Sequence, residues 1–177
     1  MLILPIQFDA NEWFVLIVLI FLLSAFIFLP KILPHSITIA LLLFFAAIGK
    51  WTDYVLGIKY QLYIGIDTYQ QELFDWLCLG VAYPLFGYFY VYFMMKWKLK
   101  GVIVAPYILV WAALIWFLEW VSTLFKVFTY NEWRLTYSFF VYLTLLITAF
   151  FYVKVIFRFY SEEKDQDRQI LDPFGKL

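Results

Sequence analysis

The sequence predicts an all-α membrane protein, a bundle of five transmembrane helices. The chain of 177 residues is 66% hydrophobic with a mean hydropathy of +0.85, whereas a soluble domain is about half apolar. Its apolar residues gather in five segments near the roughly 20 residues that cross a bilayer. Trp residues stand close to the predicted ends of four of these segments, where amphipathic rings prefer the membrane interface.

The five predicted helices are joined by short connections. They span about residues 13–29, 36–57, 69–95, 102–128 and 131–159. Pro30 follows the first helix, and Ser36 is a suitable N-cap for the second. Pro84 lies within the third, where it removes a backbone hydrogen bond. The predicted domains are therefore a helical bundle over 1–160 and a charged cytoplasmic tail over 161–177.

Basic residues predict the orientation, because cytoplasmic connections carry an excess of Lys and Arg. With the N-terminus outside, nine basic residues lie inside and four outside. The inner nine are Lys31, Lys96, Lys98, Lys100, Lys154, Arg158, Lys164, Arg168 and Lys176, and the outer four are Lys50, Lys59, Lys126 and Arg134. We therefore predict a multi-pass cell-membrane protein with its N-terminus outside and its C-terminus inside. A four-helix bundle that lacks the short first segment, with both ends inside, is the structural alternative.

Composition excludes several classes of function. Lys plus Arg and Asp plus Glu balance at 13 each, so net charge indicates no nucleic-acid partner. Cys78 is the single cysteine, which excludes an internal disulfide. With one His and one Cys, a dedicated zinc or haem site is not expected. The sequence contains no P-loop, GxSxG or HExxH motif, and we predict no cofactor, metal or catalytic residue.

Four charged residues lie inside predicted helices, at one level of the outer half. Lys50, Asp53, Asp75 and Glu119 stand roughly 6–14 Å from the outer ends of their helices, at 1.5 Å per residue. A charge facing lipid costs roughly 2.5–3.5 kcal/mol. All four are therefore expected to turn inward, where Lys50 can pair with an acid. They are the candidate residues of a ligand or ion pocket.

Four further residues are expected to surround this pocket. Tyr54 shares a helix face with Asp53, Glu72 lies three residues before Asp75, and Thr123 and Lys126 follow Glu119 by about one and two turns. The acids Asp53, Glu72, Asp75 and Glu119 exceed the bases Lys50 and Lys126 by two charges. Such a cluster either holds a proton on one carboxyl group or attracts a cation.

Two segments resemble a family of small, uncharacterised multi-pass membrane proteins of spore-forming Gram-positive bacteria. They are ELFDWLCLGVAYPLFGYFYVYF (72–93) and EWVSTLFKVFTYNEWRLTYSFFVYL (119–143). An acidic residue, a Tyr-Pro step and a later Glu before an aromatic-rich final helix recur there in similar order. The family has no assigned activity, so the resemblance implies a bacterial plasma membrane.

The sequence leaves three functional hypotheses. The first is a transporter-like protein or accessory membrane subunit whose outward-facing polar pocket binds a cation or small ligand. The second is a structural or assembly protein whose polar cluster only locks helices together. A membrane-embedded enzyme is the third, with paired carboxylates as acid and base. Because the chain is small for a transporter, we expect a homo-oligomer, a larger membrane complex or a binding protein, with the lipid bilayer as its surroundings.

Overall fold

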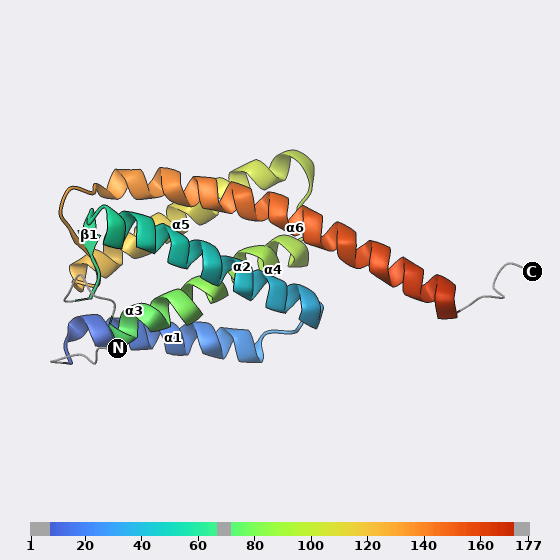
Figure 1. Ribbon diagram of the computed structural model, residues 1–177, viewed down its shortest axis with the longest axis horizontal. Helices are drawn as coiled ribbons and strands as arrows, with labels where there is room; N and C mark the ends of the chain where they lie inside the picture. The colour runs from blue at the N-terminus through green and yellow to red at the C-terminus, as the bar shows by residue number, and fades with distance from the viewer. Residues whose placement is uncertain (1–7, 67–71, 172–177) are drawn as a thin grey trace, which may run out of the picture.

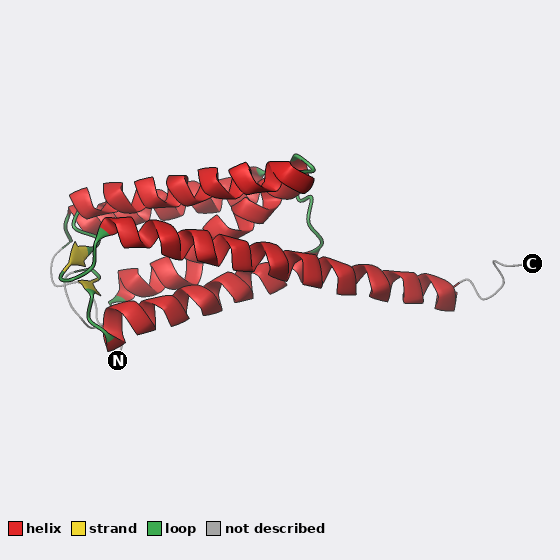
Figure 2. Ribbon diagram, turned by 90° about the horizontal axis from the view of Figure 1, so that it is seen from above, coloured by secondary structure: helices red, strands yellow, loops and turns green. Residues whose placement is uncertain are grey.

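The computed structural model describes residues 8–66 and 72–171, and five helices in these ranges are long and apolar enough to cross a membrane. These spans are Ala10–Phe28, His35–Lys59, Leu73–Lys96, Gly101–Leu124 and Leu135–Glu162. They run alongside one another as a bundle (Figures 1 and 2). The predicted all-α class with five helices is thus confirmed for the described residues. The four-helix alternative omitted the first segment, which forms a full helix here.

Two of the spans are not uniform α-helices. The α-helices are α1 (Ala10–Phe28), α2 (His35–Asp53), α3 (Leu73–Leu77), α4 (Tyr83–Lys96), α5 (Val104–Leu124) and α6 (Leu135–Leu171). The second span ends in a π-helical segment, η1 (Tyr54–Lys59), and the third contains another, η2 (Cys78–Ala82), between α3 and α4. A short 3₁₀ turn, η3 (Gly101–Ile103), precedes α5. Because a π-helix bonds i to i+5, it shifts the angular position of the residues that follow.

Capping residues explain two helix starts that differ from the predicted ones. Helix α1 begins at Ala10, before the predicted residue 13, because Asp9 and Glu12 form a capping box in which the Asp9 N–H donates to Glu12 Oε2 at 2.6 Å. Helix α3 begins at Leu73, after the predicted residue 69, because Glu72 and Asp75 form a second box. In both helices the carboxylate three residues after the N-cap accepts the backbone N–H group of the N-cap residue.

Helix α4 is the most enclosed part of the third span and lies against α2 (Figure 1). Tyr88, Tyr90 and Tyr92 are each no more than 2% exposed, so these tyrosines fill the core. At Gly87 the ring of Phe45 from α2 packs directly on the backbone, since a Cβ there would lie 2.1 Å from Phe45 Cγ. This glycine allows α2 and α4 to approach closely.

One end of the bundle is closed by a small two-stranded sheet, which we call the β cap. Strand β1 (Tyr63–Ile64) pairs antiparallel with β2 (Thr129–Tyr130), with Tyr63 opposite Tyr130. The Leu62 carbonyl also accepts the backbone N–H groups of Asn131, Glu132 and Trp133 at 3.0–3.3 Å. The connection after η1 is thereby joined to the connection between α5 and α6.

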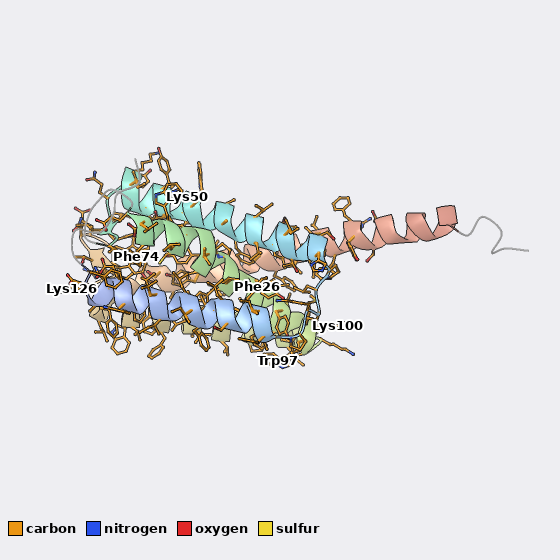
Figure 3. The ribbon with its side chains drawn as sticks, turned by 90° about the horizontal axis from the view of Figure 1, so that it is seen from below. Phe26, Lys50, Phe74, Trp97, Lys100 and Lys126 are labelled. Carbon is orange, nitrogen blue, oxygen red and sulfur yellow. The ribbon has the colours of Figure 1, made fainter. Side chains whose placement is uncertain are left out.

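The two ends of the bundle carry different labelled residues. Lys126 lies at the end closed by the β cap, and Trp97 and Lys100 lie at the opposite end (Figure 3). The orientation prediction placed Lys126 and Lys100 on different sides of the membrane. Their separation along the bundle is compatible with that arrangement.

Helix α6 is longer than each of the other described helices. Its 37 residues correspond to roughly 55 Å at 1.5 Å per residue, and its C-terminal part extends past the other helices (Figure 2). The helix therefore continues beyond the predicted end at residue 159, into the segment that was predicted to be a charged tail. Exposed Arg158 and Glu162 form an i, i+4 ion pair of 2.9 Å there.

Candidate functional site

A cavity of about 210 Å³ lies directly below the β cap. Its walls come from α2, α4, α5 and α6, together with residues of both connections. Most of the lining is apolar. Among the lining residues that the structure describes, the acidic side chains are Asp53 and Glu119, and there is no Lys, Arg or His.

Asp53, the last residue of α2, is held by the β cap. The Tyr63 hydroxyl donates a hydrogen bond of 2.8 Å to Asp53 Oδ1. The Tyr63 ring lies against Gly57, where a Cβ would come within 3.2 Å of it. Burial, together with the nearby Asp53 charge, raises the pKa of Tyr63 well above its ordinary value. The phenol therefore remains a proton donor to Asp53 at ordinary pH.

Glu119 is held by a second set of hydroxyl donors. Its Oε1 accepts hydrogen bonds from the Tyr130 hydroxyl at 2.6 Å and the Ser138 hydroxyl at 2.8 Å. The indole of Trp133 donates to the Ser138 oxygen at 2.8 Å. The other carboxylate oxygen, Glu119 Oε2, is buried and accepts no hydrogen bond from the described residues. Tyr142, another residue of the cavity wall, also interacts with the Glu119 side chain.

The β cap brings the two carboxylates into one arrangement. Residues directly opposite in an antiparallel ladder project from the same face of the sheet, so Tyr63 and Tyr130 leave the cap together. One reaches Asp53 and the other reaches Glu119. Burial and the bond to Glu119 raise the pKa of Tyr130, so both phenols act as donors. The cap thus links helices α2 and α5 through a pair of tyrosine–carboxylate bonds.

Of the four predicted pocket residues, the structure brings Asp53 and Glu119 to one cavity. Lys50 and Asp75 are not among its lining residues. The Lys50 ammonium lies 3.3 Å from the centre of the Trp76 ring, within electrostatic reach of Asp53 and Asp75. Asp75 accepts the backbone N–H groups of Glu72 at 2.9 Å and Ile66 at 3.3 Å, so it organises the start of α3.

The four predicted surrounding residues also lie outside the cavity lining. Tyr54 is 48% exposed beside Trp51, because it follows Asp53 by one residue and its side chain projects about 100° further round the helix. Glu72 is buried as the N-cap of α3. The Thr123 hydroxyl donates to the Trp120 carbonyl at 2.7 Å. Lys126 is exposed, at a backbone φ of +59° that ends the turn after α5.

Sequence reasoning missed the donors that hold the carboxylates. Tyr63 and Tyr130 lie in connections between predicted helices, and Trp133 and Ser138 lie near the start of the last predicted helix, 131–159. Helical periodicity, the signal used for the acids, does not apply to a connection. The available signal was the presence of Tyr residues of high β-propensity in two connections on the same predicted side.

Comparisons with known proteins found no match: no family model, no curated protein and no solved structure resembles the chain closely enough to report. In the described residues, no group of three or more His, Cys, Asp or Glu side chains is placed to hold a metal ion. The class of protein is therefore inferred from the fold and the site alone. The five apolar spans have the pattern of a small multi-pass membrane protein, with an acidic cavity at one end of the bundle.

Proposed function

We propose that this protein binds a positively charged ligand in the cavity below the β cap, as a transporter-like protein or as an accessory subunit of a membrane complex. The observation that carries the proposal is the environment of the Glu119 carboxylate. Glu119 shares a cavity with Asp53, and no basic residue is among the described residues that line it. Its Oε2 accepts no hydrogen bond from the described residues. A cation that donates hydrogen bonds would satisfy this oxygen.

Energetics support a ligand rather than an empty site. A buried polar atom without a hydrogen bond costs about 1–3 kcal/mol, and more when it is charged. Two carboxylates in one apolar cavity also repel each other when both are ionised. A bound cation relieves both costs at once. Because the carboxylates are anchored by the cap, their positions are already set before the ligand arrives.

The alternative function is a structural one, and a specific observation favours it. Through Tyr130 and Ser138, Glu119 joins α5 to β2 and α6. A polar group that ties elements together in this way can serve stability alone. If so, Glu119→Gln weakens the lock, because a neutral amide oxygen replaces the charged acceptor, and no cation restores the lost stability. If the carboxylate belongs to a cation site, Glu119→Gln relieves repulsion, and stability in the absence of ligand is maintained.

The test measures unfolding of the purified full-length protein in one mild detergent. Wild type, Glu119→Gln and the control Glu132→Gln are compared in sodium, calcium, methylammonium and benzylammonium chlorides at equal ionic strength. Glu132 is exposed, so its substitution makes the same chemical change away from the cavity. A cation present at 100 times its Kd stabilises the folded state by about 2.7 kcal/mol. We expect at least one of the four to stabilise wild type and Glu132→Gln but not Glu119→Gln. If none does, the proposal is wrong.

We also propose that the protein resides in a bacterial plasma membrane, with its N-terminus outside and the β cap on the outer side. The excess of basic residues on the other side supports this orientation. Resemblance of segments 72–93 and 119–143 to membrane proteins of spore-forming bacteria supports the location. In this orientation the cavity lies in the outer half of the membrane. Its ligand would enter from the exterior or from the outer leaflet.

A further inference from the structure

We propose that the ligand is an organic ammonium ion with an apolar body of about one ring. This inference rests on the proposed cation site and names its chemical class. It follows from three properties of the cavity, which are the distribution of polar groups along it, the kind of side chains in its wall and its size.

Polar and apolar groups occupy different depths of the cavity. Asp53 and Glu119 lie next to the β cap, through their bonds to Tyr63 and Tyr130. Phe45 lies about two turns deeper on α2, roughly 12 Å along the axis, and Ile115 lies about one turn deeper on α5. Helix α6 follows the same order. Its polar Ser138 precedes apolar Val141, Leu145 and Leu146. A ligand that fits both regions has a charged head and an apolar body.

Aromatic rings form much of the wall and suit a cation of low charge density. Phe128, Tyr63 and Trp133 line the cavity near the cap, and Phe128 packs edge-on against Tyr63 at 5.9 Å between ring centres. Tyr83 and Tyr142 also line the cavity. Ring faces attract ammonium groups, more strongly when water is excluded. The wall therefore contributes to cation binding without adding further acids.

The acidic end of the cavity suits an ammonium group better than a metal ion. Calcium takes six to eight oxygen ligands in most sites, but Asp53 Oδ1 and Glu119 Oε1 already accept hydroxyl donors. A primary ammonium group needs only acceptors for three N–H donors. Glu119 Oε2 provides one acceptor, and the lining residues Ser122 and Thr52 lie on the same two helices as the acids.

The volume of the cavity limits the size of the ligand's apolar part. An apolar protein cavity of about 150 Å³ accommodates benzene. The cavity here is about 210 Å³, which leaves room for one ring and a short charged arm. Benzylammonium has this composition, and methylammonium is the same head without the ring. Benzyl alcohol has nearly the same shape but no charge, so the three compounds separate charge from apolar contact.

The experiment measures binding of these three compounds to the full-length protein in detergent, by the shift in unfolding midpoint and by tryptophan fluorescence. Trp133 lines the cavity, so an occupied site changes its emission. We expect benzylammonium to bind roughly tenfold or more tightly than methylammonium, because the ring is removed from water. Benzyl alcohol should bind wild type weakly. Glu119→Gln should lose the preference for benzylammonium over benzyl alcohol. Glu132→Gln, measured in the same detergent, should keep the preference, so uptake of the compounds by micelles cannot explain its loss in Glu119→Gln.

A second variant tests the apolar end without touching an acid. Ile115→Phe places a larger side chain in the deeper region and should weaken benzylammonium binding while methylammonium binding is retained. If methylammonium or calcium stabilises wild type as strongly as benzylammonium does, the ligand class is wrong but the cation site stands. If benzyl alcohol binds as tightly as benzylammonium, or if no cation acts through Glu119, both proposals are overturned.

Discussion

The bond between Tyr130 and Glu119 is the strongest test of how the β cap is attached. Tyr130→Phe removes one hydroxyl, which lies 2.6 Å from Glu119 Oε1, and leaves the ring in place. A hydrogen bond to a charged group contributes about 1.5–3 kcal/mol. Ser138 remains as a donor to the same oxygen at 2.8 Å, so the loss should fall toward the lower half of that range.

The assay is reversible unfolding of wild type and variants in one detergent at pH 8, followed by circular dichroism. Tyr60→Phe is the matched control, because Tyr60 lies beside the cap with its side chain 59% exposed. Surface substitutions of this kind stay within about 0.5 kcal/mol of wild type. We expect a clear difference between the two Tyr→Phe variants. Equal stability of Tyr130→Phe and Tyr60→Phe would refute the reasoning that the carboxylate anchors the cap.

Tyr63 provides an internal check, because it stands opposite Tyr130 in the ladder. Tyr63→Phe removes the bond of 2.8 Å to Asp53 and should cost a comparable amount. The two bonds hold the same cap, so their effects should be coupled, by roughly 0.5–3 kcal/mol. The double variant should then lose less than the sum of the single losses. Strict additivity would show that the two tyrosines act independently.

Three further predictions concern the bundle as a whole. Reporter fusions at the two termini should place the N-terminus outside and the C-terminus inside, and a shared side would contradict the five-span topology in the membrane. Gly87→Ala should destabilise by roughly 1–3 kcal/mol because the added methyl meets the Phe45 ring. Gly80→Ala, whose added Cβ has no atom of the described residues within 4 Å, should not show that clash in the same unfolding assay. Deleting residues 163–177 should leave unfolding in detergent nearly unchanged, and a large loss of stability would show that this segment packs on the bundle.

Much of the fold could be predicted because the bilayer constrains helix length and composition so strongly. The five spans follow from hydropathy, and each contains one of the predicted segments or most of it. Helix starts were less predictable. Glu12 and Asp75 interact with backbone N–H groups at their helix starts. When the start of a helix is not known, such a capping carboxylate cannot be distinguished from a charge buried within the helix.

The candidate site could be predicted in part, for a physical reason. Asp53 and Glu119 were placed together because a charge within an apolar span has to turn inward, and the two lie at similar depth. Tyr54 was expected beside Asp53, but consecutive residues of a helix project about 100° apart, and Tyr54 lies on the more exposed side. The cap could not be predicted, because pairing of Tyr63 with Tyr130 depends on contacts between connections that are distant in sequence.

The structural and ligand-binding readings of Glu119 are connected through its two oxygens. Tyr130 and Ser138 both donate to Oε1, which fixes the carboxylate, while Oε2 accepts no bond from the described residues. A carboxylate held through one oxygen loses little freedom when a cation binds the other, so the lock itself would favour binding. Tyr130→Phe should therefore weaken benzylammonium binding although Tyr130 is not among the residues that line the cavity. If the variant loses stability but binds benzylammonium as wild type does, the lock and the site are separate properties of Glu119.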